Sequence, residues 1–187
     1  MDQRELVDRA ARGDHDAFAV LVRGAIARLD AAARLILRDP ELARDAVQEA
    51  LVGAWRGLPG LRDPERFDAW LHRLTVHACL NLLRRRRRRA VEVELTPLHG
   101  TPIADFSSYI ADRDQLDRAL QRLDPESRAV IVVHYFLGMA LPETASTLGI
   151  PLGTVKSRLH RSLVAMRIAM TIEPSLEAAE LPRGQYA

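Results

Sequence analysis

Apolar positions recur every three or four residues along most of this chain, and this spacing predicts helices rather than strands. A first short helix is predicted to open at Asp2, whose spacing from Glu5 fits a capping box, and to stop at Gly13. A longer helix is predicted to start at Asp14. Its buried side is predicted to hold Phe18, Leu21, Val22, Ala25, Leu29 and Ile36.

An aspartate followed by a proline marks the next helix, because aspartate caps free amides and proline fits the first helical position. The pair Asp39-Pro40 opens a helix that is expected to run to about Arg56. Its predicted buried residues are Leu42, Ala46, Val47, Ala50, Leu51, Ala54 and Trp55. After a loop over residues 57–64, a helix is predicted over residues 64–89. Its predicted core stripe is Phe67, Leu71, Leu74, Ala78 and Leu82.

The helical pattern stops between about Ala90 and Ala111, where two prolines interrupt a stretch without hydrophobic period, and this predicts a linker. Helices are predicted to resume at Leu116, Leu120 and Leu123, and Asp124-Pro125 caps the next one. That helix is predicted to bury Ala129, Val130, Val133, Phe136 and Leu137.

Residues 141–162 predict two helices joined by a tight turn at Gly149, a residue suited to the left-handed position past a helix end. The first helix has its apolar residues at Leu141, Ala145 and Leu148. The second has an apolar stripe of Val155, Leu159, Leu163, Met166 and Met170. Its other side carries Thr154, Lys156, Ser157, Arg158, His160 and Arg161. Cations and small hydroxyls at this place are typical of a helix-turn-helix that reads the major groove, although an ordinary helical hairpin with a solvated basic face is the alternative.

The predicted helix over residues 64–89 is a second basic element. Its basic stripe consists of Arg66, Arg73, His77 and Arg84. Trp70 and Asn81 lie between this stripe and the core stripe, and six consecutive arginines at 84–89 close the helix. A polyphosphate partner would neutralise such a run, and an aromatic beside cations suits stacked single-stranded bases. Core packing of Trp70 and an unspecific phosphate-binding tail are the alternatives.

Composition narrows the class of protein. The chain has 187 residues, 48% of them hydrophobic, with a net charge of +2 and a pI near 9.1, which fits one or two small helical cores. The single cysteine, Cys79, has no partner for an internal disulfide, which fits a reducing compartment. The N-terminus has no signal-peptide core, and no apolar stretch reaches the ~20 residues of a membrane helix, so a cytoplasmic location is expected.

Catalysis and metal binding are not expected. His72, His77 and Cys79 are scattered around a helix at spacings of five and two, and the N-terminal part offers no clustered carboxylates for metal-assisted phosphoryl transfer. His134 is better explained by packing. The sequence therefore predicts no enzyme, no metal and no cofactor.

Taken together, these segments resemble the extracytoplasmic-function (ECF) sigma factors, the smallest bacterial RNA polymerase initiation factors, over residues 5–167. Residues 45–55 resemble the family's polymerase-binding helix. Residues 67–73, with the arginines after them, resemble the helix that engages the opened −10 promoter element. Residues 123–130 and 149–161 resemble the domain that binds the −35 element.

The resemblance implies an all-α fold of two small helical domains joined by a flexible linker, the second containing the helix-turn-helix. The implied divisions are 1–90 (region 2-like), 91–112 (linker), 113–172 (region 4-like) and 173–187 (mobile tail). It also implies a subunit without catalysis that gives core RNA polymerase its promoter choice. An anti-sigma protein is implied as a further partner by resemblance only.

Site residues follow from matching these segments. Core polymerase would bind Asp45, Gln48 and Glu49. The −10 strand would bind Trp70, Arg73, His77, Asn81, Arg84 and Arg85. The −35 duplex would bind Thr154, Lys156, Ser157, Arg158, His160 and Arg161. The chain departs from the family where His77 replaces a frequent asparagine, Asn81 a common aspartate and Thr144 an aliphatic residue, and where Pro142 enters the first turn of its helix.

Two other functions compete with this interpretation. A dimeric helix-turn-helix regulator explains the C-terminal third but leaves the basic, tryptophan-containing helix without a role. A DNA-acting enzyme, such as a recombinase with a helix-turn-helix tail, lacks a candidate catalytic centre in the N-terminal domain.

Overall fold

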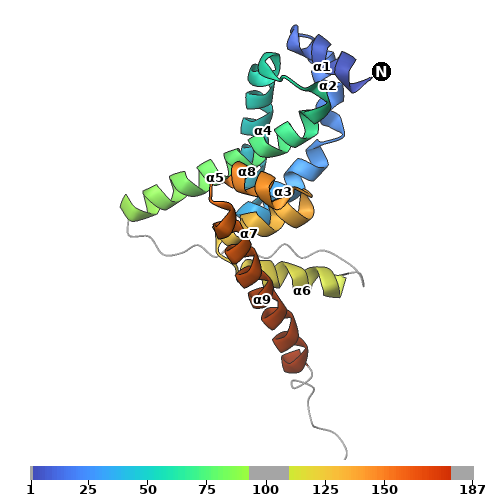
Figure 1. The fold of residues 1–187 in the computed structure, drawn as a ribbon. Helices are drawn as coiled ribbons and strands as arrows, with labels where there is room; N and C mark the ends of the chain where they lie inside the picture. The colour runs from blue at the N-terminus through green and yellow to red at the C-terminus, as the bar shows by residue number, and fades with distance from the viewer. Residues whose placement is uncertain (1, 93–109, 178–187) are drawn as a thin grey trace, which may run out of the picture.

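The computed structural model describes residues 2–92 and 110–177, and every regular element in these two stretches is helical (Figure 1). The N-terminal elements are α1 (Gln3–Ala11), α2 (His15–Arg23), α3 (Ile26–Leu37), α4 (Pro40–Gly57), η1 (Leu58–Gly60), η2 (Pro64–Arg66) and α5 (Phe67–Glu92). The C-terminal elements are α6 (Ile110–Gln121), α7 (Pro125–Ile131), η3 (Val132–Phe136), α8 (Leu141–Leu148) and α9 (Leu152–Glu177). The predicted all-α fold is confirmed.

Aspartate caps begin several of these helices, as predicted. The side chain of Asp39 accepts hydrogen bonds from the amides two and three residues further on, both at 3.1 Å. Asp124 does the same at 3.1 and 2.9 Å, and Asp14 accepts from the Ala17 amide at 3.0 Å. The predicted capping box at Asp2 is wrong, because its side chain is exposed and makes no capping bond.

The long helix predicted from Asp14 is two helices, α2 and α3. The chain turns at Gly24, where the Ala25 amide bonds to the Val22 carbonyl at 2.9 Å. Glycine destabilises a helix interior, which favours a break at Gly24. The apolar residues keep the same helical period on both sides of Gly24, so the hydrophobic pattern does not reveal the break. Of the predicted buried side, Val22, Leu29 and Ile36 are buried, and Phe18, Leu21 and Ala25 are half-buried.

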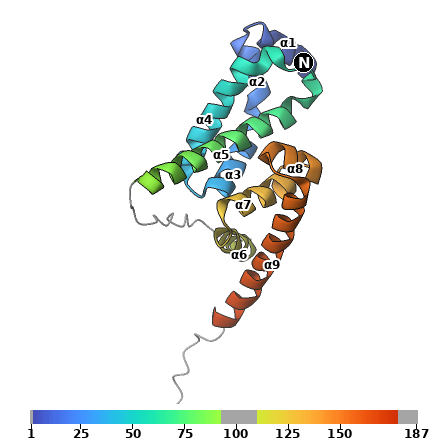
Figure 2. The same cartoon turned by 60° about the vertical axis from the view of Figure 1, so that its left-hand side comes forward.

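Helix α5 lies lengthwise along α4 and also contacts α3 and α8 (Figure 2). Phe67, Leu71 and Ala78 of its predicted core stripe are buried, while Leu74 and Leu82 are half-buried. The buried face is wider than predicted, because neighbours cover α5 on several sides. The additional buried residues are Thr75, Val76 and Cys79.

In the C-terminal part, α6 and α7 pack against α9 around Leu120, Leu123 and Met166. Phe136 is 37% exposed, so its predicted burial is wrong. The reason is the winding of η3, which is a π-helical turn rather than a continuation of α7. The Phe136 ring lies outside the core, and its centroid is 5.8 Å from the guanidinium carbon of Arg28.

The two parts share one apolar core. A single buried cluster contains Cys79 of α5 together with Ala129 of α7 and Leu148 of α8, so the C-terminal domain is packed against the N-terminal one. At the domain boundary, α5 continues to Glu92 and α6 begins at Ile110, which makes both ends of the predicted linker helical. The rest of that linker lies outside the described residues. Helix α9 runs to Glu177, so the first five residues of the predicted tail are helical, and the rest of the tail also lies outside the described residues.

Candidate functional site

The helix-turn-helix is formed by α8 and the first turns of α9. Gly149 ends α8 in the left-handed conformation at φ 66°, and the Ile150 amide then bonds to the Ala145 carbonyl at 3.1 Å. Val155 is fully buried and belongs to the same core as Ala145 and Leu148. Burial of Val155 fixes the orientation of α9 and leaves the opposite side of this helix exposed to solvent.

The predicted recognition residues divide by exposure. Lys156, Ser157, His160 and Arg161 are exposed, and Thr154 and Arg158 are half-buried. Two contacts lie within the helix: the Ser157 hydroxyl donates to the Thr154 carbonyl at 3.1 Å, and Arg161 Nε donates to the Ser157 carbonyl at 3.3 Å. Arg158 instead donates to Glu126 of α7 at 3.2 Å. Arg158 is therefore held by its own domain, and the other cations face outward.

Two residues of α8 depart from the family pattern, Thr144 and Pro142, and the helix accommodates both. Thr144 is fully buried where an aliphatic residue is expected, and its hydroxyl donates to the Met139 carbonyl at 3.3 Å. Pro142 lies in the first turn, where an amide has no carbonyl partner within the helix. The Glu143 carboxylate accepts from the Ala140 amide at 3.1 Å, which completes the helix start.

The predicted −10 residues form a strip along α5, which we call the α5 strip: Trp70, Arg73, His77, Asn81, Arg84 and Arg85. Its cations are exposed, and Trp70 is half-buried. The Trp70 ring centroid lies 6.0 Å from that of Phe67, and a side chain at Gly57 would meet the indole at 3.2 Å. One edge of Trp70 is thus packed on the core. His77 is exposed, but its Nε2 lies 2.8 Å from the Thr147 carbonyl of α8.

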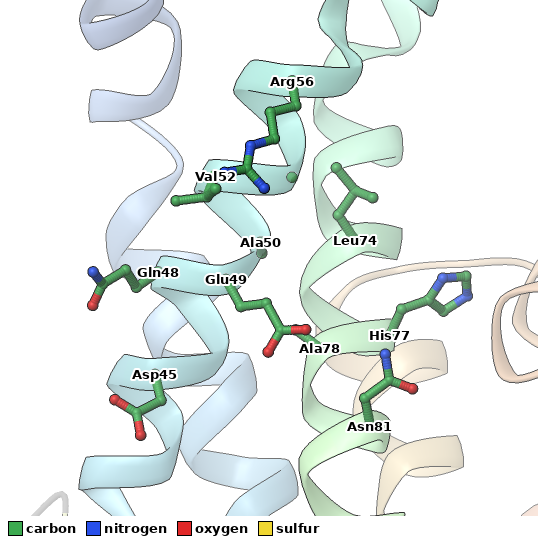
Figure 3. Close-up of a pocket in the computed structure, with 11 residues that line it drawn as sticks. Asp45, Gln48, Glu49, Ala50, Val52, Arg56, Leu74, His77, Ala78 and Asn81 are labelled. Carbon is green, nitrogen blue, oxygen red and sulfur yellow. The ribbon is translucent and has the colours of Figure 1, made fainter.

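The predicted polymerase-binding residues border a groove of about 530 Å³ between α4 and α5. Its lining includes Asp45, Gln48, Glu49, Arg56, His77 and Asn81. Figure 3 shows Glu49 reaching from α4 toward α5, while Gln48 projects to the other side of α4. Glu49 forms an ion pair with Arg85 at 3.6 Å. The groove therefore brings candidates from two predicted sites, His77 and Glu49, to one surface.

Carboxylates of the chain itself accompany the arginine run. Arg85 pairs with Glu49, Arg86 lies 3.3 Å from Asp39, and Arg87 lies 3.7 Å from Glu126. Glu126 also forms an ion pair with Arg158, so this one carboxylate contacts an arginine from each of the two predicted DNA-binding elements. The sequence analysis did not single out Glu126, because an acidic residue in the first turn of a helix is common. Nothing in a linear pattern connects position 126 to position 87.

The remaining titratable groups suggest structural roles. Burial raises the pKa of Cys79 to about 12, which keeps its thiol neutral. Burial, and next the charge of nearby Arg28, lower the pKa of His72.

Within residues 2–92 and 110–177, no three side chains of His, Cys, Asp or Glu come together as metal ligands would. None of the helices described here has the length and apolar character of a membrane span.

Fold and surface together define a helical protein with a helix-turn-helix and a second basic helix in a separate domain. Family models agree with this division: "Sigma-70 region 2" matches residues 21–89, and "Sigma-70, region 4" matches residues 113–166.

Curated relatives are similar over most of their length. The chain is 38% identical over 159 residues to the ECF RNA polymerase sigma factor SigM of Mycobacterium tuberculosis, covering 84% of this chain and 79% of the relative. It is 34% identical over 151 residues to the RNA polymerase sigma-E factor of Streptomyces coelicolor, covering 81% and 84%. The chain therefore belongs to the ECF RNA polymerase sigma factors, a family of transcription initiation factors.

Solved structures have the same fold. CnrH, in complex with the cytosolic domain of CnrY, superposes with a TM-score of 0.58 at 30% identity, covering 96% of this chain and 99% of that one. The sigma factor RpoE from Bartonella quintana, in complex with the anti-sigma factor NepR, superposes with a TM-score of 0.71 at 22% identity, covering 83% and 97%.

Proposed function

We propose that this sigma factor acts in the cytoplasm as a non-catalytic subunit and selects promoters through three surfaces. Residues 1–90 would form the domain that binds core polymerase and the −10 element, and residues 113–172 the domain that binds the −35 element. Asp45, Gln48 and Glu49 of α4 would bind core polymerase. The α5 strip would capture the separated −10 strand. The recognition face of α9 would read the −35 duplex through Thr154, Lys156, Ser157, Arg158, His160 and Arg161.

The observation that carries this proposal is the recognition face of α9. Val155 fixes the helix on its buried side, while Lys156, His160 and Arg161 project from the exposed side. An exposed N-terminal half with cations is what the major groove requires of a recognition helix. Arginine can form two hydrogen bonds to guanine, whereas lysine mainly neutralises phosphate.

The α5 strip supports strand capture by a different chemistry. Trp70 offers a partly exposed aromatic face, and Arg73 and Arg84 are exposed cations on the same side of the helix. Stacking on an aromatic tolerates any base, and neighbouring cations neutralise the backbone, which is how single strands are commonly bound. Binding through this strip should weaken steeply with salt.

The polar face of α4 supports docking on polymerase. Asp45, Gln48 and Glu49 are exposed, while Val47 and Ala50 face the core. Charge changes at Asp45 or Glu49 can therefore alter a partner surface without opening the apolar core. Polymerase would also set the spacing of the two DNA contacts, so that two weak contacts act with high effective concentration.

A protein partner of the anti-sigma type is a further part of the proposal. CnrH, which is 30% identical to this chain, was solved in complex with the cytosolic domain of CnrY, so a protein of this fold can be bound by another protein. Copurification of an endogenous partner with tagged chain, followed by loss of transcription on adding that partner, tests this part.

Run-off transcription with purified core polymerase tests the main proposal. Adding the chain should stimulate initiation from a subset of promoter fragments, and omitting it should leave only background. Tight binding of the isolated protein to a palindrome, with no stimulation of core polymerase, would contradict the proposal and favour the dimeric regulator.

A further inference from the structure

Arg158 differs from its neighbours on the recognition face in what it contacts. Its Nη2 donates to Glu126 Oε2 of α7 at 3.2 Å, whereas the contacts of Ser157 and Arg161 stay within α9. The Arg158 side chain is 25% exposed, while Lys156 is exposed. Arg158 therefore lies against its own domain, on the side of the recognition face that meets α7.

The start of α7 holds Glu126 in place for this contact. Asp124 caps the helix, and its carboxylate accepts from the Glu126 amide at 3.1 Å and from the Ser127 amide at 2.9 Å. The backbone of Glu126 is thus fixed in the first turn of α7. Because α7 packs on α9, the carboxylate and the guanidinium meet within one domain.

A carboxylate and a phosphate are alternative partners for an arginine. Both present negatively charged oxygen acceptors, and the guanidinium binds either one through its N–H groups. In this structure the Glu126 carboxylate occupies Arg158. A DNA phosphate that binds Arg158 must displace Glu126, so the strength of the ion pair is lost from the DNA contact.

The pair also lowers the charge that DNA meets at this edge of α9. Glu126 and Arg158 together carry no net charge, whereas a free arginine would attract the backbone. The part of the affinity that does not depend on sequence grows with the number of phosphates that the protein neutralises. An arginine held by a carboxylate adds less to that number than an unpaired one.

A second arginine contacts Glu126 from the other domain. Arg87 lies 3.7 Å from the Glu126 carboxylate, and the Arg87 side chain is 82% exposed. The contact of Arg158 is shorter, and its side chain is less exposed. Ion pairs between exposed side chains contribute little, so Arg158 is the partner that Glu126 holds more firmly.

We propose that Glu126 is an internal phosphate mimic: it competes with the DNA backbone for Arg158 and so lowers the affinity of the recognition helix for any duplex. The proposal rests on the DNA-binding role proposed above for the recognition face of α9. Phosphate contacts carry no sequence information, so the competition acts alike on promoter and random DNA. A weaker duplex contact makes binding depend more on the other contacts of the holoenzyme.

Glu126→Gln removes the charge and keeps the shape of the side chain. It should tighten the Kd of the full chain for a fluorescent duplex of random sequence by about two- to fivefold at low salt, the range expected for an exposed ion pair. The Glu126 side chain is 52% exposed, so the variant should remain folded, which thermal melting checks.

Glu41→Gln is the matched control. It changes the net charge equally and also removes an exposed pair, Glu41 with Arg44 at 2.9 Å, but on α4 and outside the proposed DNA surfaces. Its Kd for the random duplex should equal that of wild type. Equal tightening by Glu41→Gln and Glu126→Gln would overturn the proposal, because net charge alone would explain it.

Arg158→Ala completes a double-mutant cycle. In the Arg158→Ala background, Glu126→Gln should have no further effect, because no guanidinium remains to be released. A second duplex, the −35 region of the fragment that responds most in run-off transcription, should be tightened by the same factor as the random one.

The outcomes separate this inference from the function on which it rests. Tightening by Glu126→Gln that disappears without Arg158 supports the proposal. Equal Kd values for wild type and Glu126→Gln overturn it. Tightening that persists without Arg158 also overturns it, since the carboxylate would then act through Arg87 or directly on phosphate.

Two results concern the DNA itself. Weaker binding of Glu126→Gln to the −35 duplex alone would overturn the proposal, because Glu126 would then position Arg158 for a base. Absence of duplex binding in every protein at low salt would overturn it together with the DNA-binding role of α9. Equal affinity of wild type for both duplexes, with the cycle as expected, would support the phosphate competition and contradict only the proposed −35 reading.

Discussion

The two proposed DNA-binding surfaces of this chain differ in what occupies them. On α9, the contacts of Ser157 and Arg161 are made within the helix, so the recognition face needs no rearrangement to meet DNA. On α5, His77 reaches a carbonyl of the other domain, 70 residues further along the chain. Charge and spacing indicate which surface can bind a polyanion. Only the three-dimensional contacts show whether that surface is available.

The largest expected effect concerns the polar face of α4 that is proposed to bind core polymerase. Polymerase would hold the −10 and −35 contacts at the correct spacing. Reversing Asp45 and Glu49 to lysine together should abolish copurification with core polymerase, because two exposed carboxylates of one helical face become cations. Circular dichroism should remain helical. Glu41→Lys is the control, since Glu41 is exposed on the same helix and pairs locally with Arg44. A double variant that still copurifies would show that this docking face is misassigned.

A smaller effect is expected from Trp70→Ala on the α5 strip. Loss of one stacked base should weaken open-complex formation by ~1–3 kcal/mol, while binding to closed duplex changes little. Trp70 also packs on Phe67, so the free energy of unfolding should fall, by less than the ~3–5 kcal/mol of a fully buried aromatic.

Trp55→Ala provides the comparison for this variant. Trp55 is half-buried too, but it stacks on His15 at 4.3 Å, away from the α5 strip. Thermal melting should show similar destabilisation for the two variants, and permanganate footprinting should show a promoter-opening defect only for Trp70→Ala. Equal opening by both folded variants would remove Trp70 from strand capture.

On the open surface, Arg161→Ala should weaken initiation that depends on the −35 element by ~1–3 kcal/mol and relax base discrimination there, if the lost contact is bidentate to guanine. Arg158→Ala should affect base choice less, because Glu126 already holds that guanidinium. Competition binding on duplexes with single-base changes measures both. Greater loss of discrimination for Arg158→Ala would reverse their assigned roles.

The smallest effect is expected from Lys156→Ala. This exposed cation should contribute one phosphate contact, so its removal should weaken all sequences alike and reduce the slope of log affinity against log salt by about one. Filter binding across a salt series gives the slope. An unchanged slope would remove the phosphate role of Lys156.

Much of the fold could be predicted because local chemistry determines it. Asp39 and Asp124 form the predicted caps, and Gly149 adopts the left-handed conformation that the helix-turn-helix requires. The break at Gly24 could not be predicted, since the apolar residues on both sides keep one period. The outward position of Phe136 depends on a π-helical turn, for which the sequence carries no distinct pattern.

The candidate site was predictable in its residues but not in its arrangement. Exposed cations on α5 and α9 follow from helical spacing, whereas the contact of His77 with Thr147 depends on how two domains pack. Thr75 and Cys79 are buried for the same reason: neighbouring helices cover more of α5 than its own stripe suggests. Contacts between distant segments, such as Arg87 with Glu126, leave no trace in a linear pattern.

The most direct test of two separate DNA-binding surfaces is promoter selection from a randomised library by core polymerase loaded with wild type, Arg161→Ala or Asn81→Asp. Sequencing of the transcribed templates should give two conserved blocks for wild type. Arg161→Ala should alter base preference only in the upstream block, and Asn81→Asp only in the downstream block. A wild type that selects no promoter, or two variants that alter the same block, would contradict the account.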